Sequence, residues 1–218
     1  MTEPPHLADL RRDYEERPFD IADTDADPFR QFARWFDEVV AATELEPNAA
    51  VLATADAGGR PSARHVLVKG VDGRGFTVFT NHGSRKARQL AANPRASLVF
   101  TWAPLARQVI VEGTVERVDD ADSDAYFATR PRSSQLGAWA SEQSTVLPDR
   151  AALDARYVEA EERFAGRPVE RPPFWGGYRV VPDRVEFWQG RPSRLHDRIV
   201  YRPDADRTGS WRRERLAP

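Results

Sequence analysis

The sequence contains only two lysines, Lys69 and Lys86, among 32 lysine and arginine residues. A lysine ammonium is a compact point charge, whereas an arginine guanidinium is a wide planar fork, so the two rarely substitute for each other in a tight site. Lys69 ends a run of β-forming residues, and Lys86 follows Ser84 and Arg85 where a helix is expected to begin. Both positions suggest phosphate binding, although two surface lysines retained by chance would give the same pattern.

A predicted helix N-terminus lies just before Lys86. Ser84 is a preferred N-cap residue, and the first backbone N–H groups of a helix attract anions because they lack partners within the helix. Gly83 would let a ligand approach the backbone closely. The pattern predicts an anion site at residues 83–86, although many helices begin with a serine and a basic residue without binding a ligand.

The strand predicted at residues 62–69 carries Arg64 and Lys69. Side chains alternate between the faces of a strand, so two residues five positions apart should point in opposite directions unless a β-bulge intervenes. The two cations would then serve two anions, or one ligand reached around the strand edge. An ordinary amphipathic strand with charged ends is the alternative.

A second basic cluster contains Tyr126, Arg130 and Ser134. Tyr126 and Arg130 are four residues apart and share a helix face. Ser134 continues that row only if Pro131 opens a new helical turn. A phenol, a guanidinium and a hydroxyl that converge can hold a phosphate through charge-assisted hydrogen bonds. The same residues are also typical of a solvated helix end.

The densest polar group is the segment 194–198, which reads Arg-Leu-His-Asp-Arg. In an extended conformation Arg194, His196 and Arg198 share one face, Leu195 points to the core and Asp197 points away. Three cations on one face repel each other unless an anion or an electron-rich ring lies among them. Upstream, Trp188 and Gln189 would offer an aromatic wall and an amide to a planar heterocycle.

Several other chemistries are excluded by residue content. The sequence has no cysteine, its four histidines lack metal-ligand spacing, and no glycine-rich dinucleotide motif or P-loop occurs. No serine lies in a nucleophile elbow. We therefore expect no metal site, and the predicted anion sites point to a phosphorylated cofactor that carries out the reaction.

The chain has 218 residues and a net charge of −2, and its hydrophobic fraction of 40% is typical of a globular protein. Interspersed charges give no overall field that would indicate nucleic acid or an anionic membrane as a partner. The sequence has neither a signal-like start nor an apolar run of about 20 residues. A cytoplasmic protein is expected.

The elements that must position these residues are mainly strands. Tight turns separate strands predicted from residue 49 to residue 118, with a helix after Ser84, and this pattern indicates an antiparallel barrel or sandwich. A helix begins at Asp27-Pro28 and carries an apolar stripe that ends with Val39 and Val40, and helices follow at 121–129, 134–141 and 149–164. Two β segments, 177–181 and 184–189, and a strand near Trp211 complete the chain. We expect an N-terminal flexible arm (1–26) and one domain (27–218).

Together these motifs resemble the pyridoxine/pyridoxamine 5′-phosphate oxidase family from near residue 7 to the last residue. The matching runs are at residues 64–69, 80–86, 107–109, 130–139, 141–144, 174–177, 186–190, 194–198 and 215–218. Many separate motifs in one order are far more specific than any single motif. The resemblance implies a mainly β (α+β) fold, the antiparallel, Greek-key-like, FMN-binding split β-barrel.

The resemblance also implies a function. Such enzymes use FMN, bound between the subunits of a homodimer, to oxidise pyridoxine 5′-phosphate and pyridoxamine 5′-phosphate to pyridoxal 5′-phosphate in vitamin B6 biosynthesis and salvage. A hydride would pass from the substrate's C4′ atom to FMN, and O2 would be reduced to hydrogen peroxide. FMN, O2 and the two substrates are thus the expected small-molecule partners, without nucleic acid or membrane.

Site residues carry over by position in the motifs. Those implied for FMN are Arg64, His65, Val66, Leu67, Val68, Lys69, Phe79, Thr80, Arg85, Lys86, Gln108, Gln143, Ser144, Trp188 and Arg198. Those implied for the substrate are Arg11, Arg12, Asp13, Tyr14, Lys69, Tyr126, Arg130, Ser134, Arg194, Leu195 and His196. Arg194 and His196 are the implied catalytic residues, facing the pyridine ring, and Lys69 is shared by both ligands.

Two positions depart from the family pattern. Phe79 stands where the family often has tyrosine, and Asp13 replaces the usual glutamate, which shortens that side chain's reach. The alternatives are a related split-barrel oxidoreductase that uses a flavin or a deazaflavin on another substrate, and a protein that stores flavin or pyridoxal phosphate without turnover. The pairing of the Tyr126 cluster with Arg194 and His196 argues against the first alternative, and the intact carboxy-terminal motif argues against both.

Overall fold

The computed structural model describes residues 14–15, 17–43 and 46–218. Its contacts divide the chain into two compact units, which we describe separately. The barrel unit comprises Asn48–Val99 and Val111–Asp183, and the terminal unit comprises the described residues up to Pro47 together with Phe100–Ile110 and Arg184–Pro218. Three strands run from one unit into the other.

A closed antiparallel β-barrel forms the barrel unit. Its strands are β1 (Ala49–Ala55), β2 (Pro61–Asp72), β3 (Gly75–Asn81), β4 (Arg95–Trp102), β5 (Arg107–Arg117) and β6 (Trp175–Gln189). The order is β3-β2-β1-β4-β5-β6, and pairing of β3 with β6 closes the ring. This arrangement confirms the expected barrel with flanking helices and excludes the sandwich.

Alternation of side chains explains how the strands close around a core. Burial alternates strictly along β1, as expected for a strand with one face inward. Fully buried apolar residues fill the interior of this unit, namely Leu52, Phe76, Val78, Leu98, Val111 and Val180. In β2 the register shifts between Val68 and Gly70, so a bulge lies at Lys69.

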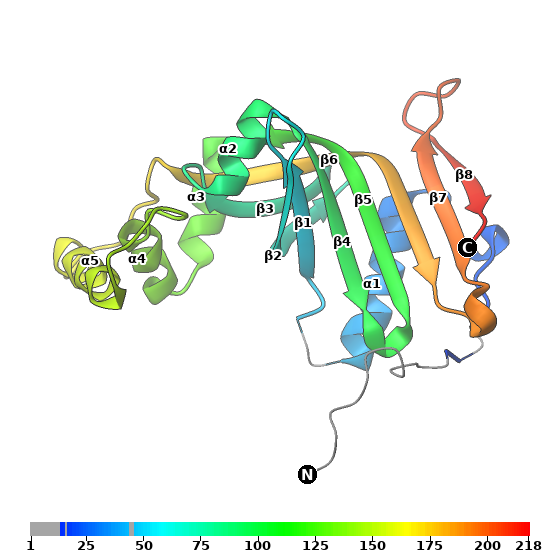
Figure 1. Ribbon diagram of the computed structural model, residues 1–218, viewed down its shortest axis with the longest axis horizontal. Coiled ribbons are helices and arrows are strands. Elements are labelled where there is room, and N and C mark those ends of the chain that lie inside the picture. The colour runs from blue at the N-terminus through cyan, green and yellow to red at the C-terminus, as the bar shows by residue number, and fades with distance from the viewer. Residues whose placement is uncertain (1–13, 16, 44–45) are drawn as a thin grey trace, which may run out of the picture. The chain divides into compact units, whose positions relative to one another are not determined.

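Four helices accompany the barrel strands. They are α2 (Arg85–Ala92), α3 (Asp120–Thr129), α4 (Arg132–Ala140) and α5 (Arg150–Arg163). They confirm the helices predicted from residues 84, 121, 134 and 149, and Figure 1 shows α4 and α5 side by side. Phe127, Leu136 and Phe164 form a buried cluster with Trp175 of β6.

Helix α1 (Pro28–Ala42) is the main helix of the terminal unit. Asp27 caps it by accepting the N–H of Phe29 at 2.8 Å, as its sequence predicted. Phe32 packs on Phe100 at 5.0 Å, and Trp35 packs on Phe187 at 5.2 Å. The remaining elements of this unit are η2 (Ile21–Asp23), η3 (Ala103–Leu105), η4 (Pro192–Arg194), β7 (Asp197–Pro203) and β8 (Trp211–Leu216).

Two expectations about these elements were wrong. Val40, expected in the packed stripe of α1, is 51% exposed. The two β segments predicted at 177–181 and 184–189 are one strand, β6. Pro182 does not end this strand because the φ angle of proline fits extended backbone, and only one N–H is lost from the ladder.

The predicted arm, residues 1–26, is only partly described. Phe19 is buried and packs on Trp35 with ring centroids 4.7 Å apart. The hydroxyl of Tyr201 donates to the carbonyl of Asp25 at 2.8 Å. Residues near 19–25 therefore pack against α1 and β7, and the division into an arm and a single domain stays a prediction.

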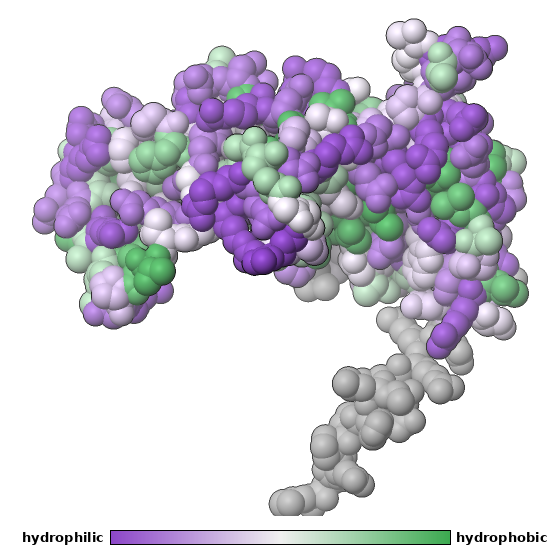
Figure 2. Space-filling model, turned by 45° about the horizontal axis from the view of Figure 1, so that its top comes forward, coloured by the Kyte–Doolittle hydropathy of each residue, from purple (hydrophilic) through white to green (hydrophobic). Residues whose placement is uncertain are grey.

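No helix in the described part of the chain is long and apolar enough to cross a membrane. On the face drawn in Figure 2, hydrophilic residues predominate and hydrophobic residues occur in scattered groups.

Candidate active site

A cavity of about 820 Å³ opens in the barrel unit. It is lined by residues of β2, β3, β6, α2, α3 and α4 and of the loop after α4. The cationic members are Arg64, Lys69, Arg85, Lys86 and Arg130. None of the described residues that line it is an aspartate or a glutamate, so the cavity presents positive charge without internal neutralisation.

Lys86 is the most deeply buried of these cations, with 9% of its surface exposed. Ser84 caps α2 and thereby fixes the turn that carries Lys86. The Lys86 ammonium donates to Thr80 Oγ1 and to Gln143 Oε1, both at 2.9 Å. Burial, with a smaller effect from the charge of Arg64, lowers the pKa of Lys86 to about 8. Burial therefore disfavours the protonated form of Lys86, and a bound anion would stabilise that form.

Arg64 lies near Lys86 and is also held by neutral groups. Its two terminal nitrogens donate to Thr54 Oγ1 at 2.7 Å and to Ser62 Oγ at 2.5 Å. Both hydroxyls donate onward to the amide oxygen of Gln89. Burial and the nearby charge of Arg85 lower the pKa of Arg64. These hydrogen bonds hold the Arg64 guanidinium in place, and they leave its charge available for an anion because all the partners are neutral.

Lys69 lines the same cavity as Arg64. Strict alternation would place the two side chains on opposite faces of β2, and the sequence allowed a common side only with a bulge. The register shift between Val68 and Gly70 supplies that bulge. The bulge thus allows the two side chains to line one cavity, and their role in binding an anion stays a prediction.

Tyr126, Arg130 and Ser134 also meet at the cavity. Pro131 caps α4 through its carbonyl, which accepts the N–H of Ser134 at 2.8 Å, so a new helix opens there as the row of three required. Burial lowers the pKa of Arg130, and burial raises the pKa of Tyr126 despite the arginine beside it. The solvated-helix-end alternative does not hold for Arg130.

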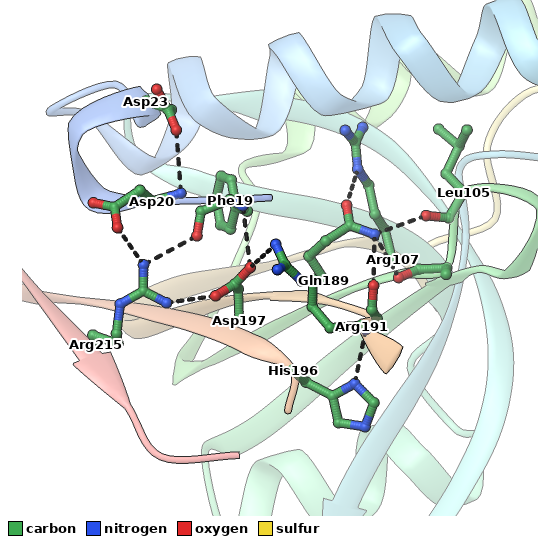
Figure 3. Close-up of polar contacts among 12 residues, drawn as sticks. Phe19, Asp20, Asp23, Leu105, Arg107, Gln189, Arg191, His196, Asp197 and Arg215 are labelled. Atoms are coloured by element: carbon green, nitrogen blue, oxygen red, sulfur yellow. Dashed lines mark hydrogen bonds and ion pairs between the residues drawn. The ribbon is translucent and has the colours of Figure 1, made fainter. Parts of the chain in front are cut away.

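In the terminal unit, His196 packs among aromatic rings. Its ring centroid lies 4.6 Å from that of Trp188 and 5.8 Å from that of Tyr14. The backbone N–H of Arg191 donates to His196 Nδ1 at 3.1 Å (Figure 3), which leaves Nε2 to carry the proton of the neutral ring. Burial and the charge of Arg194 lower the pKa of His196.

Asp197 ties the start of β7 to its surroundings (Figure 3). Its carboxylate accepts from Arg215 at 2.6 Å and from the backbone N–H of Phe19 at 3.1 Å, and it pairs with Arg191 at 3.4 Å. Nearby, Gln189 donates to the carbonyls of Leu105 and Ala106. Gln189 is 1% exposed, so its amide is bound within the fold and is not offered to a planar heterocycle as expected from its place beside Trp188.

The segment before β7 is not extended, which corrects a prediction. Ser193 and Arg194 have φ angles of 56° and 63°, in the left-handed region, and Arg194 ends the short helix η4. Such a turn breaks the alternation of side chains. Leu195, predicted to point to the core, is consequently 67% exposed.

A second correction concerns the charge of Arg198. Its guanidinium donates to both carboxylate oxygens of Glu186, at 2.7 and 3.1 Å, and Arg184 contacts the same carboxylate. Burial acts to raise the pKa of Glu186, but the hydrogen bonds from the two arginines outweigh it and lower that pKa. Glu186 on the neighbouring strand thus supplies an anion to Arg198, where the sequence suggested a bound anion or an electron-rich ring.

Comparison with known proteins identifies the family. Residues 36–164 match the family described as pyridoxamine 5′-phosphate oxidase. The chain belongs to this family. Residues 175–218 also match the pyridoxine 5′-phosphate oxidase C-terminal dimerisation region.

Relatives in the pyridoxamine 5′-phosphate oxidase family span nearly the whole chain. The pyridoxine/pyridoxamine 5′-phosphate oxidase of Ralstonia pickettii (strain 12J) is 60% identical, over 97% of this chain and 99% of that protein. The corresponding protein of Rubrobacter xylanophilus is 58% identical, over 97% and 96%.

Solved structures agree on the fold. PhzG from Burkholderia lata 383, solved with tetrahydrophenazine-1-carboxylic acid, superposes with a TM-score of 0.84 at 32% identity, over 90% of this chain and 95% of that chain. An FMN-binding protein from Nostoc punctiforme superposes with a TM-score of 0.69 at 19% identity, over 88% and 98%.

The structure gathers most, but not all, of the site residues that the family resemblance predicted. Those that line the cavity are Arg64, His65, Val66, Leu67, Lys69, Phe79, Thr80, Arg85, Lys86, Tyr126, Arg130, Ser134, Gln143 and Ser144. Val68 does not line it and is 5% exposed in the core. Gln108 lies on β5 within the terminal unit. Arg11, Arg12 and Asp13 lie outside the described residues.

Sequence reasoning assigned no role to other residues that line the cavity. They include Asn81, Gly137, Ser141 and Trp175. All four lie in the family motifs, which were the signal that could have found them. Asn81 Nδ2 donates to the carbonyl of Ser141 at 3.1 Å and joins β3 to the end of α4. No group of three or more His, Asp or Glu residues in the described chain suits a metal ion.

Proposed function

We propose that this protein oxidises pyridoxine 5′-phosphate and pyridoxamine 5′-phosphate to pyridoxal 5′-phosphate, with FMN as cofactor and O2 as electron acceptor. The observation that carries this proposal is one cavity lined by five cationic side chains and, among the described residues, by no aspartate or glutamate. We assign Arg64, Arg85 and Lys86 to a first cationic group, and Lys69 and Arg130 to a second. Two phosphorylated molecules that share one cavity would each need such a group.

The first group fits the phosphate of FMN. Lys86 and Arg64 are held in place by hydroxyls and amides, so neither charge is offset before a ligand arrives. A phosphate dianion would add charge-assisted hydrogen bonds to both, with Arg85 at the rim. Bound FMN would supply the redox chemistry, taking two electrons from the substrate and passing them to O2.

The second group fits the phosphate of the substrate. Arg130 contributes a guanidinium with unused donors, and Tyr126 and Ser134 contribute hydroxyls from the adjoining helices. Lys69, at the bulge of β2, lines the same cavity and is proposed to contact both ligands. Oxidation of the alcohol would give pyridoxal 5′-phosphate and hydrogen peroxide, and oxidation of the amine would consume water and also release ammonia.

Arg194 and His196 are proposed to orient the pyridine ring. His196 offers Nε2–H as a donor because Nδ1 is occupied by the Arg191 N–H. Tyr14, which packs edge-on against Trp188 and His196, would cover the ring. The match of residues 175–218 to a dimerisation region supports a homodimer, which would bring two such sets of residues into one assembly.

Anaerobic titration of the purified yellow protein with pyridoxine 5′-phosphate tests the proposal. We expect the flavin absorbance to bleach and to return on admission of air, with hydrogen peroxide and pyridoxal 5′-phosphate formed in equal amounts. Pyridoxine without phosphate should bleach it far more slowly at the same concentration. A yellow protein that does not bleach would favour flavin storage, and bleaching only by a tricyclic carboxylic acid would favour a PhzG-like substrate.

A further inference from the structure

We propose that Trp175 is a positioning residue that holds the Arg130 guanidinium ready for a phosphate by stacking instead of by ion pairing. The Cζ atom of Arg130 lies 4.7 Å from the centroid of the Trp175 ring and 5.5 Å from that of Phe127. Trp faces attract a cation more strongly than Phe faces. Trp175 itself is 6% exposed and lines the cavity.

The donors of Arg130 remain available as a result. Its Nη1 atom is buried and has no hydrogen-bond partner among the described residues. Arg171, in the same unit, shows the opposite arrangement, because its guanidinium is committed to Asp120 at 2.7 Å and to Asp124 at 2.5 Å. A carboxylate partner would occupy the donors of Arg130 and repel a phosphate, whereas an aromatic face restrains the guanidinium without doing either.

Trp175 is rigid enough to act as a platform. Its backbone N–H donates to the carbonyl of Pro172 at 3.0 Å, and its carbonyl accepts from Arg171 Nη1 at 2.6 Å. The register of β3 and β6 places it opposite Asn81. Because Arg171 also pairs with α3, the tryptophan is tied to the helix that precedes Arg130.

The same platform reaches Tyr126 through Phe79. The Phe79 ring is nearly parallel to the Trp175 ring, with centroids 5.5 Å apart and an interplanar angle of 11°. Tyr126 stacks on Phe79 at 4.0 Å and 19°. One aromatic stack therefore positions both the guanidinium and the phenol of the substrate group. The inference rests on the proposed function for the identity of the phosphate ester.

Binding of pyridoxal 5′-phosphate and of pyridoxal to the FMN-loaded protein tests the role of Trp175. In Trp175→Leu the affinity for pyridoxal 5′-phosphate should fall by about 2-fold to 30-fold, the range expected for loss of a cation–π contact, while that for pyridoxal stays unchanged. The affinity of Trp175→Phe for pyridoxal 5′-phosphate should lie between those of the wild type and Trp175→Leu. The KM for pyridoxine 5′-phosphate should rise with little change in kcat, and FMN occupancy should stay at the wild-type level.

Trp139→Leu is the matched control. Trp139 also stacks with an arginine, Arg163 at 4.1 Å, but it does not line the cavity. It should leave the preference for the phosphate ester unchanged. If Trp175→Leu folds, binds FMN and prefers pyridoxal 5′-phosphate as strongly as the wild type, the inference is wrong and the proposed function stands. A wild-type protein without that preference would overturn both.

Discussion

Lys86 of α2 and Gln143 of the loop after α4 meet at 2.9 Å, with the lysine ammonium donating to the amide oxygen Oε1. The two residues are distant in sequence, and this contact joins the helix that carries the cation to the loop that closes one side of the cavity. An amide accepts the hydrogen bond without cancelling the charge. The contact thus orders the lysine while leaving it electrostatically available for an anion.

Lys86→Met should separate ligand binding from stability. We expect FMN to bind about tenfold more weakly or worse, because a charge-assisted hydrogen bond to phosphate is lost, and riboflavin to bind as before. The ligand-free variant should melt no lower than the wild type, since a buried charge without a counter-ion has been removed. Fluorescence titration measures the two affinities and thermal melts measure the stability. Arg60→Met, at an exposed position, is the control. Equal weakening for riboflavin would contradict it.

FMN affinity should fall as the pH rises above about 8. In the ligand-free protein the pKa of Lys86 is about 8, against an ordinary 10.5, so the folded protein loses this proton before the unfolded chain does. The stability of the ligand-free protein should therefore rise from pH 8 to pH 10.5 as the strain of the buried charge disappears, while affinity declines. Titrations between pH 7 and pH 10 test both trends. Lys86→Arg should flatten the affinity profile, because arginine stays protonated.

Glu186→Gln should destabilise the fold. Glu186 is 2% exposed and accepts from Arg198 and Arg184, so the substitution removes the charged partner of two partly buried cations, at a cost of about 3 kcal/mol. Urea unfolding at neutral pH measures the loss. Because the pKa of Glu186 lies below its ordinary value, its contribution is present above about pH 4.5 and is lost as the pH falls further. The difference between variant and wild type should accordingly shrink in acid; a constant difference would argue against ion pairing.

Ser193→Pro should reduce turnover without releasing FMN. Proline fixes φ near −65°, whereas Ser193 has a φ of 56°, so the turn that presents Arg194 cannot form. We expect kcat/KM to fall at least about tenfold, approaching the effect of Arg194→Ala, with flavin occupancy retained. Ser193→Asn, which tolerates the left-handed region, should keep most of the activity. Steady-state kinetics measure kcat/KM, and flavin absorbance measures the occupancy. Full activity in Ser193→Pro would show that this turn does not position Arg194.

The sequence by itself determined the elements and most of the cavity. Strand alternation, the Asp27 and Ser84 caps and the proline at residue 131 are local signals, which is why the barrel strands and helices agree with expectation. The family motifs named most of the residues that line the cavity, because they recur as short runs of defined composition. Their roles in binding and catalysis stay predictions.

Only the tertiary structure decided how charges are partnered and where side chains point. The bulge at Lys69 depends on pairing with β3, and the left-handed turn at Ser193 and Arg194 replaced the alternation that a strand would have imposed on Leu195. Glu186 is distant from Arg198 along the chain but adjacent across β6 and β7. Arg130 has no carboxylate partner among the described residues and packs on Trp175 instead, which is likewise a product of packing. Such contacts join residues far apart in sequence, so no local pattern encodes them.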